Sequence, residues 1–245
     1  MVILLAMALA SSALAGDPLP SGPSFRIETE MFQGNETAPV SRHKILFDAG
    51  VIYDIHENGG RWSTVFDPAR GRVILLDKKM QVQTQVSTEE LIRATAQLSA
   101  AAKEAGKADS LGLNAKPIPL KKEDGYAIAF GSLHYEMTTQ TVSSEELAHA
   151  YHELAVWAAR LNVLRRRGAP PFARLTLGEL VASEGRLPLH LILTIDQGLK
   201  KERYRAHHLV VERLSELDRK AIDHVGDRLA AFKKVSFEEF PSDEP

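Results

Sequence analysis

Hydrophobic and polar residues alternate along the first part of the chain. In the segment SFRIETEMFQ, Phe25, Ile27 and Met31 fall on one side, and charged residues fall on the other. Alternation of period two is typical of β-strands with one buried face. Four apolar segments follow, HKILF, GVIYDIH, RWSTVFD and GRVILLD, and then the alternating segment KMQVQTQV. The pattern predicts six strands joined by short turns in an antiparallel meander.

The last two of these six strands differ in whether one or both of their faces are apolar. GRVILLD is apolar at every position from 73 to 76, so both faces of this strand are expected to be buried. In KMQVQTQV, by contrast, Gln81, Gln83 and Gln85 share one side. That side is predicted to face water, which favours an antiparallel sheet over a parallel sheet covered on both faces.

Four aspartates in this region are candidates for chemistry. Asp48, Asp67 and Asp77 each precede turn residues, and Gly71 ends the turn that begins at Asp67. Asp side chains accept hydrogen bonds in turns, and glycine adopts a positive φ there. Asp54 lies inside a strand and has no such explanation. The turn interpretation is favoured over a carboxylate site for metal binding or acid–base chemistry.

Helical periodicity appears in three long segments, each with a capping signal. Ser87 with Glu90, Ser143 with Glu146, and Ser215 with Asp218 are the predicted caps. A shorter helix is predicted within PFARLTLGELVASEG, and two hairpins are predicted in 117–142 and 187–214. The expected order is six strands, helix, two strands, two helices, two strands and helix. This order predicts an α+β fold, a curved, half-barrel-like antiparallel sheet with helices packed on one face.

The chain begins with an uncharged apolar run from 2 to 10, followed by Ala13, Leu14 and Ala15. This arrangement predicts a secretory signal peptide cleaved after Ala15, because the run is too short to span a membrane. A buried apolar terminus is the alternative. The expected organisation is a signal peptide at 1–15, a flexible leader at 16–24, a single α+β domain at 25–240 and a disordered tail at 241–245. The mature protein is expected to be exported to the periplasm or the extracellular space.

Composition excludes several classes of function. The chain of 245 residues has no cysteine, which excludes disulfides, thiolate metal sites, cysteine nucleophiles and a lipid-modified cysteine. Its formal net charge of −2, from 30 Lys and Arg against 32 Asp and Glu, leaves no electrostatic footprint for nucleic acid or anionic lipid. Neither is an expected partner, and no integral membrane segment is predicted.

The histidines offer little catalytic signal. His149 and His152 lie three apart on a helix, but the HExxH order is absent and no third ligand is evident, so a solvated helix flank is favoured. His207 and His208 are adjacent on a strand and should face opposite sides. No GxSxG turn, phosphate loop or GxGxxG motif is present. No catalytic residue, metal site or cofactor is predicted, and the protein is not expected to be an enzyme.

The segments ILFDAGVIYDI, VFDPARGRVILLD and MQVQTQV repeat a strand, an Asp-containing turn and a strand ahead of a Ser-capped helix. In this they resemble the lipoprotein-localisation carrier superfamily of LolA- and LppX-like half-barrels, over about residues 25–106. The helical segment near 168–186 departs from that family's plan. The resemblance implies a concave sheet closed by helices, an apolar interior that holds acyl chains or another apolar ligand, and neither enzyme activity nor a cofactor.

Large side chains on the predicted strands are candidates for lining such an interior. The candidate pocket residues are Met31, Phe47, Tyr53, Trp62, Phe66 and Tyr135. The alternative is that they pack directly against the helices as ordinary core.

The sequence predicts an exported, non-enzymatic binding protein for an apolar or amphipathic ligand, such as a lipid or a lipoprotein acyl chain. One alternative is a structural or protein-interaction module without a ligand cavity. A third hypothesis is a hydrolase, which would require a histidine within hydrogen-bond reach of a Ser or Asp inside a cleft.

Overall fold

The computed structural model describes residues 22–57 and 60–241. The predicted signal peptide, its cleavage site, most of the leader and most of the tail lie outside these residues. The strands are β1 (Phe25–Gln33), β2 (Ser41–Asp48), β3 (Val51–His56), β4 (Trp62–Asp67), β5 (Arg72–Asp77), β6 (Val82–Ser87), β7 (Ile118–Pro119), β8 (Gly125–Phe130), β9 (Leu133–Thr141), β10 (Arg186–Asp196), β11 (Lys201–Val211) and β12 (Lys233–Lys234). The helices are α1 (Thr88–Glu104), α2 (Glu145–Leu164), α3 (Phe172–Ser183) and α4 (Glu216–Ala231).

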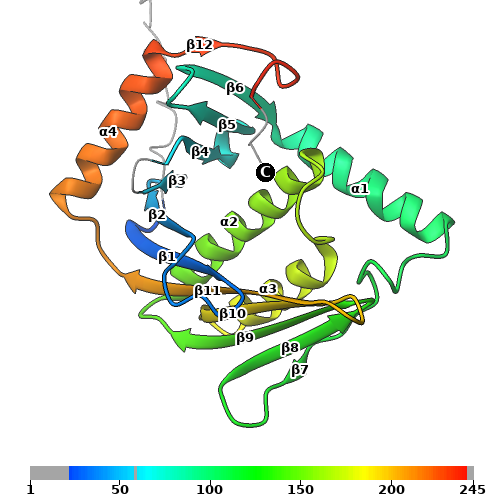
Figure 1. The fold of residues 1–245 in the computed structure, drawn as a ribbon. Helices are drawn as coiled ribbons and strands as arrows, with labels where there is room; N and C mark the ends of the chain where they lie inside the picture. The colour runs from blue at the N-terminus through cyan, green and yellow to red at the C-terminus, as the bar shows by residue number, and fades with distance from the viewer. Residues whose placement is uncertain (1–21, 58–59, 242–245) are drawn as a thin grey trace, which may run out of the picture.

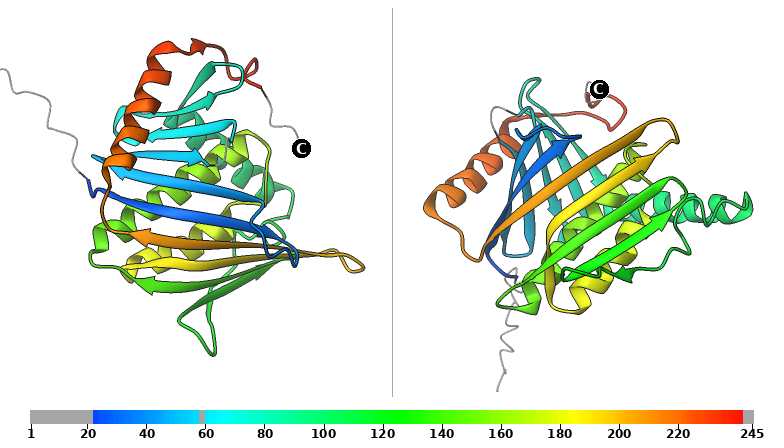
Figure 2. Two further views of the ribbon diagram at one scale, coloured as in Figure 1. Left: turned by 60° about the vertical axis from the view of Figure 1, so that its left-hand side comes forward. Right: turned by 60° about the horizontal axis from the view of Figure 1, so that its bottom comes forward.

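All twelve strands form one open sheet in the order β12-β6-β5-β4-β3-β2-β1-β11-β10-β9-β8-β7. Neighbouring strands pair antiparallel except β12, which runs parallel to β6. β1 lies between β2 and β11, so it joins the N-terminal meander to the C-terminal hairpin. The sheet curves around α2 (Figure 1; Figure 2). The α+β class, the open curved sheet and the predicted element order are confirmed, with the two-residue strands β7 and β12 as additions.

The helices cover both faces of this sheet, so the prediction of helices on one face is wrong for α4. Helix α2 lies inside the curve and packs against α1 and α3, whereas α4 lies outside it (Figure 1). Val73 and Leu75 of β5 join the core cluster inside the curve. Ile74 and Leu76 of β5 pack with Val225 of α4 on the outer face. β5 is apolar on both faces because each face is covered by a helix.

The glutamine side that the alternation predicts to face water is exposed at Gln81 and Gln85 but not at Gln83. Gln83 is 5% exposed, and its amide donates hydrogen bonds of 2.8 Å to the carbonyls of Leu229 and Phe232 at the end of α4. Carbonyl groups at a helix C-terminus lack hydrogen-bond donors within the helix, and the Gln83 side chain donates to two of them. Of the glutamines within β6, only Gln85 is exposed.

The turn interpretation of two aspartates is confirmed. Asp67 accepts a hydrogen bond from the Arg70 amide at 3.4 Å, and Gly71 adopts a φ of 62° at the end of the 3-10 turn. Asp77 accepts hydrogen bonds from the two backbone amides of the next turn and pairs with Arg61. Both carboxylates are therefore occupied. Within 22–57 and 60–241, no group of three or more His, Asp or Glu is placed to hold a metal ion.

Two of the three predicted helix caps are confirmed. Ser87 accepts from the Glu90 amide, and Ser215 and Asp218 form a reciprocal capping box. At α2 the cap is Ser144 instead of Ser143, because the helix begins one residue later than predicted. The helices of the described chain include none with the length and apolar character needed to cross a bilayer.

Candidate functional site

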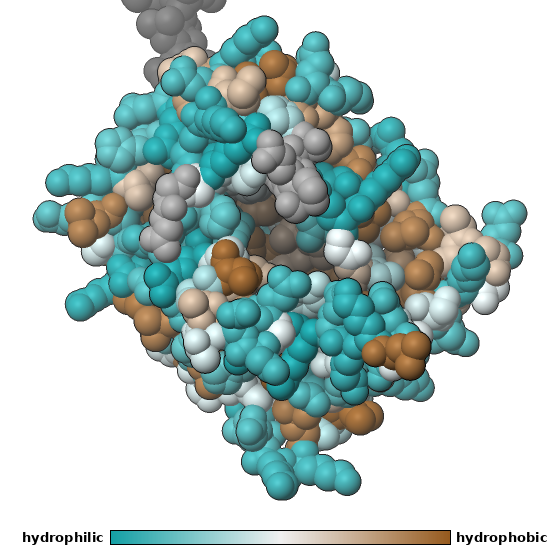
Figure 3. Space-filling view, in the orientation of Figure 1, coloured by the Kyte–Doolittle hydropathy of each residue, from teal (hydrophilic) through white to brown (hydrophobic). Residues whose placement is uncertain are grey.

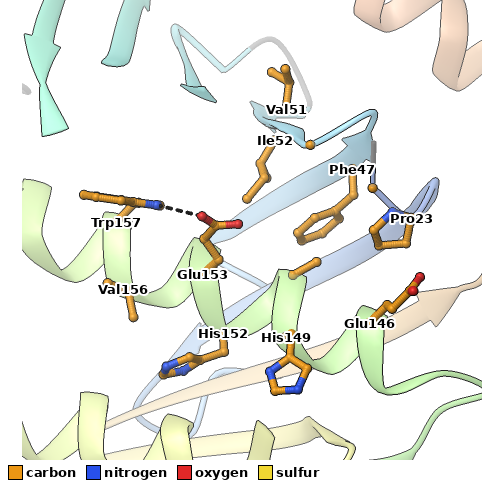
Figure 4. Close-up of a pocket in the computed structure, with 13 residues that line it drawn as sticks. Pro23, Phe47, Val51, Ile52, Glu146, His149, His152, Glu153, Val156 and Trp157 are labelled. Carbon is orange, nitrogen blue, oxygen red and sulfur yellow. Dashed lines mark hydrogen bonds between the residues drawn. The ribbon is translucent and has the colours of Figure 1, made fainter. Parts of the chain in front are cut away.

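A large cavity lies between α2 and the turn that joins β2 to β3. Its volume is about 810 Å³. Phe47 and Ile52 line it from the sheet, and Ala150, Val156 and Trp157 line it from α2 (Figure 4). Cavities of roughly 300–1,000 Å³ with mainly apolar walls are typical of small-molecule sites.

The wall formed by α2 follows from helical spacing. Positions 146, 149, 150, 153 and 157 recur at intervals of three and four, which places them on one side of a helix. This side carries the carboxylates of Glu146 and Glu153 as well as apolar groups. The indole of Trp157 donates a hydrogen bond of 3.4 Å to Glu153 (Figure 4). The cavity therefore has apolar walls with charged groups beside them.

A second, smaller cavity of about 320 Å³ borders the C-terminal part of α2, at Ala158, Leu161 and Asn162. Three polar residues of β2 and β3 line it, His43, Asp54 and His56. His43 Nδ1 and Asp54 Oδ1 are hydrogen-bonded at 2.8 Å, and the rings of His43 and His56 stack 4.7 Å apart. These contacts arise because His43 pairs opposite His56 in the β2–β3 register.

The two histidines of the smaller cavity have opposite electrostatic surroundings. Burial opposes protonation of His43, but the hydrogen bond and charge of Asp54, aided by Glu57, outweigh it and raise the pKa of His43. Burial and the neighbouring His43 lower the pKa of His56. The cavity thus places a histidine with a raised pKa beside one with a lowered pKa.

A buried polar network crosses the inner face next to these cavities. His208 Nδ1 is hydrogen-bonded to Thr29 Oγ1 at 2.8 Å, and its Nε2 lies 3.3 Å from the Tyr151 hydroxyl of α2. Burial and the charge of Arg174 lower the pKa of His208 to about 3. His207 stacks with His190 on the opposite face, which confirms the prediction that adjacent strand histidines point to opposite sides.

Three of the six predicted pocket residues line these cavities. Phe47, which stacks on Phe25 with ring centroids 4.1 Å apart, lines the larger cavity. Trp62 and Phe66 line the smaller one.

The structure places the other three predicted pocket residues elsewhere. Tyr135 is buried in a cluster with Leu177 of α3. Tyr53 lies on the outer face with the residues packed beneath α4. Met31 is 37% exposed near the end of β1.

Sequence reasoning missed most of the α2 wall and the pairing of His43 with Asp54. His149 is exposed, as a solvated flank requires, and His152 is partly buried, but both histidines line the larger cavity. The helical spacing of α2 was a usable signal, but it does not tell which side meets the sheet. For the pairing of His43 with Asp54, the usable signal was the strand register that the β2–β3 turn sets.

Compared with models of protein families and with curated proteins, the chain matches neither a family nor a curated sequence. The functional argument therefore rests on the fold and its cavities.

Proposed function

We propose that the protein binds an apolar or amphipathic ligand, a lipid or a lipoprotein acyl chain, between α2 and the β2–β3 turn, and catalyses no reaction there. The observation that carries this proposal is the cavity of about 810 Å³ with Phe47, Ile52 and Trp157 in its walls. Water in such a space finds few hydrogen-bond partners, so an apolar chain that displaces it lowers the free energy.

Apolar surface is also exposed at the other ends of these strands. In the face drawn in Figure 3 the surface is hollowed near the centre, where α2 runs in Figure 1, and apolar residues lie inside the hollow; the β2–β3 turn, which borders the larger cavity, lies on the side turned away in this view (Figure 2). Contiguous apolar surface open to solvent marks binding sites in monomeric proteins. The structural alternative without a cavity has no comparable support.

The carrier superfamily and export belong to the same proposal. An open sheet curved around a helix supports membership of the half-barrel carriers, and the apolar run at 2–10 with Ala15 supports export before the ligand is met. α4 on the outer face and α3 beside α2 would be additions to that plan.

Filling the cavity should abolish binding. Ala150→Phe places a ring in the space that the ligand would occupy, so we expect at least a tenfold loss of affinity for a fluorescent fatty acid. Ala96→Phe, at an exposed position of α1, is the matched control and should bind normally. Native mass spectrometry of protein from its own compartment, followed by organic extraction, should show a lipid-sized adduct. The carrier function fails if no adduct appears and the probe does not bind at micromolar concentration.

The position of the ligand can be read from tryptophan fluorescence. The chain has two tryptophans, so Trp62→Phe leaves Trp157 in the cavity wall as the emitter. A fatty acid brominated along its chain should quench this emission in Trp62→Phe, and Ala150→Phe in the same background should prevent the quenching. Binding of the probe without quenching would place the ligand elsewhere.

Hydrolysis is a second candidate function, because a histidine lies within hydrogen-bond reach of an aspartate inside a cavity. Asp54 orients His43 through Nδ1, which leaves Nε2 free to take a proton from water as it attacks an ester. If the protein is a hydrolase, we expect His43→Gln to lower the rate of hydrolysis of p-nitrophenyl esters at least 100-fold. His224→Gln, exposed on α4, is the control. Hydrolysis at this site is excluded if His43→Gln and the wild type act equally on these esters.

A further inference from the structure

The outer face of the sheet is covered by a helix in only one half. Helix α4 packs on that face over β4 and β5, where Val65, Ile74 and Leu76 lie beneath it. On β9, β10 and β11 the same face carries no helix of the described chain, and the right-hand view of Figure 2 shows these strands in front. The side chains of this bare half are therefore open to another molecule.

Two open cavities adjoin on the bare half. One, of about 430 Å³, is lined by Phe32 of β1, by His190 and Ile192 of β10, and by Arg203, Arg205 and His207 of β11. The other, of about 410 Å³, extends from β10 toward the loop between β7 and β8. The two cavities have His190, Ile192 and Arg203 in common. They therefore form one continuous groove, the outer groove.

Strand geometry brings these side chains to one side. Arg203, Arg205 and His207 are two residues apart on β11, so all three point to the outer face. On β10, Ile192 lies opposite Arg205, and His190 lies opposite His207. The two imidazole rings stack with their centroids 4.7 Å apart. Alternate positions of a strand are about 6.6–6.8 Å apart, so the two arginines leave the sheet at this interval.

The β11 end of the outer groove carries positive charge. The side chain of Arg203 has no hydrogen bond or ion pair with any residue that the structure describes. Arg205 lies over the Phe32 ring, 5.1 Å from its centroid, and donates to the Glu36 carbonyl at 2.7 Å. The described residues that line this end include no carboxylate. Two guanidinium groups are thus held side by side without an acidic partner.

The other end of the outer groove is balanced. Lys121 and Lys122 line it together with Glu123 and Glu136. Burial and the neighbouring His207 lower the pKa of His190, which disfavours a charge on the ring between the two ends. The excess of positive charge therefore lies at the arginines of β11.

An extended acidic peptide matches this arrangement. Its alternate side chains lie on one side at about the same 6.6–6.8 Å interval as the two arginines. Guanidinium groups bind carboxylates through charge-assisted hydrogen bonds. Single-stranded nucleic acid, in contrast, binds through bases that stack on open rings. Here His190 and His207 stack on each other, and Arg205 covers the Phe32 ring, so the charges favour the peptide.

We propose that the outer groove binds an extended acidic segment of a partner protein, with carboxylates two residues apart bound by Arg203 and Arg205. Ile192, between the two ends of the groove, gives the segment an apolar contact. The groove and the larger cavity lie on opposite faces of the sheet. This inference therefore goes beyond the proposed ligand and does not depend on it.

Fluorescence anisotropy with a labelled synthetic peptide tests the binding. The probe is a short peptide in which aspartate alternates with serine, at low ionic strength, where surface charges are least screened. The same peptide with asparagine in place of each aspartate should bind the wild type about tenfold more weakly, because two exposed ion pairs are lost. A peptide of the same composition with its aspartates in one contiguous run should also bind more weakly.

Arg203→Gln removes one cation of the outer groove. Its side chain has no partner within the described protein, so the variant should fold. Binding of the alternating peptide should weaken about fivefold, as expected for one exposed ion pair. Arg213→Gln, at an exposed position beyond the end of β11, is the matched control and should bind as the wild type does. Both variants should bind a fluorescent fatty acid equally, because neither residue lines the larger cavity.

The outcomes that overturn the proposal are distinct. Equal affinity of the wild type for the aspartate and asparagine peptides would do so, as would equal binding by Arg203→Gln and Arg213→Gln. Tighter binding of the contiguous peptide would show that the two arginines do not set the spacing of the carboxylates. Tighter binding of oligothymidylate than of the alternating peptide would assign the outer groove to nucleic acid and reject a peptide partner.

Discussion

Replacing Asp218 with alanine should lower the free energy of unfolding by about 3–5 kcal/mol. Asp218 is 1% exposed and accepts hydrogen bonds from the Arg26 guanidinium at 2.9 Å and from the Ser215 amide at 2.8 Å. The substitution removes the half of the α4 capping box in which Asp218 accepts from the Ser215 amide, and it leaves Arg26 of β1 with the ion pair to Glu28. One carboxylate thus joins the outer helix to the middle of the sheet.

Urea unfolding followed by circular dichroism measures this loss. Asp227→Ala is the matched control, because Asp227 lies on the same helix with a side chain that is 81% exposed. The control should change stability by less than about 0.5 kcal/mol. Equal midpoints for the two variants would show that the contact between Asp218 and Arg26 does not hold α4 in place.

Stability should fall steeply as the pH drops below about 6.5, because of His208. The pKa of His208 falls from 6.5 to about 3 in the folded protein, through burial first and then the charge of Arg174. Between these values the unfolded chain binds a proton that the folded chain rejects. Each unit of pH in this window therefore removes about 1.4 kcal/mol from the free energy of unfolding.

His208→Gln should reduce this pH dependence while preserving a polar side chain next to Thr29. His56, His152 and His190 also have lowered pKa values, so the part of the dependence that they contribute remains in the variant. Urea unfolding at several pH values between about 6.5 and about 4.5 makes the comparison. Asp77 and Asp218 do not interfere, because their pKa values are lowered and their stabilisation is lost only below about pH 4. His43 acts in the opposite sense, since its pKa is raised and its contribution is lost as the pH rises. A wild type whose stability falls no more steeply than that of His208→Gln would contradict the prediction.

The parts of this fold that depend on neighbouring residues could be predicted from the sequence. The turn of Asp67 and Gly71 and the caps at Ser87 and Ser215 are local, so a few positions define each one. At α2, Ser143 and Ser144 both fit the cap pattern, and a local rule does not choose between them.

The parts that depend on distant segments could not be predicted in the same way. Alternation assigns Ile74 and Gln83 to a face of their strands, but it does not tell what covers that face. Helix α4, which covers both residues, comes more than a hundred residues later in the chain. The hydrogen bond of Arg174 to the Tyr151 hydroxyl also depends on α2 packing against α3, and no periodicity in the segment around 174 marks it.

The two outermost strands influence how copies of this protein behave when they meet. An open sheet leaves the backbone of its edge strands free to pair with another chain, which is how fibrous aggregates begin. Here one edge is Lys233–Lys234 and the other is Ile118–Pro119. Lysines repel an incoming strand through charge and desolvation, and proline lacks the amide that pairing requires. The curved sheet can thus stay unclosed around its cavity without offering either edge as a template for polymerisation.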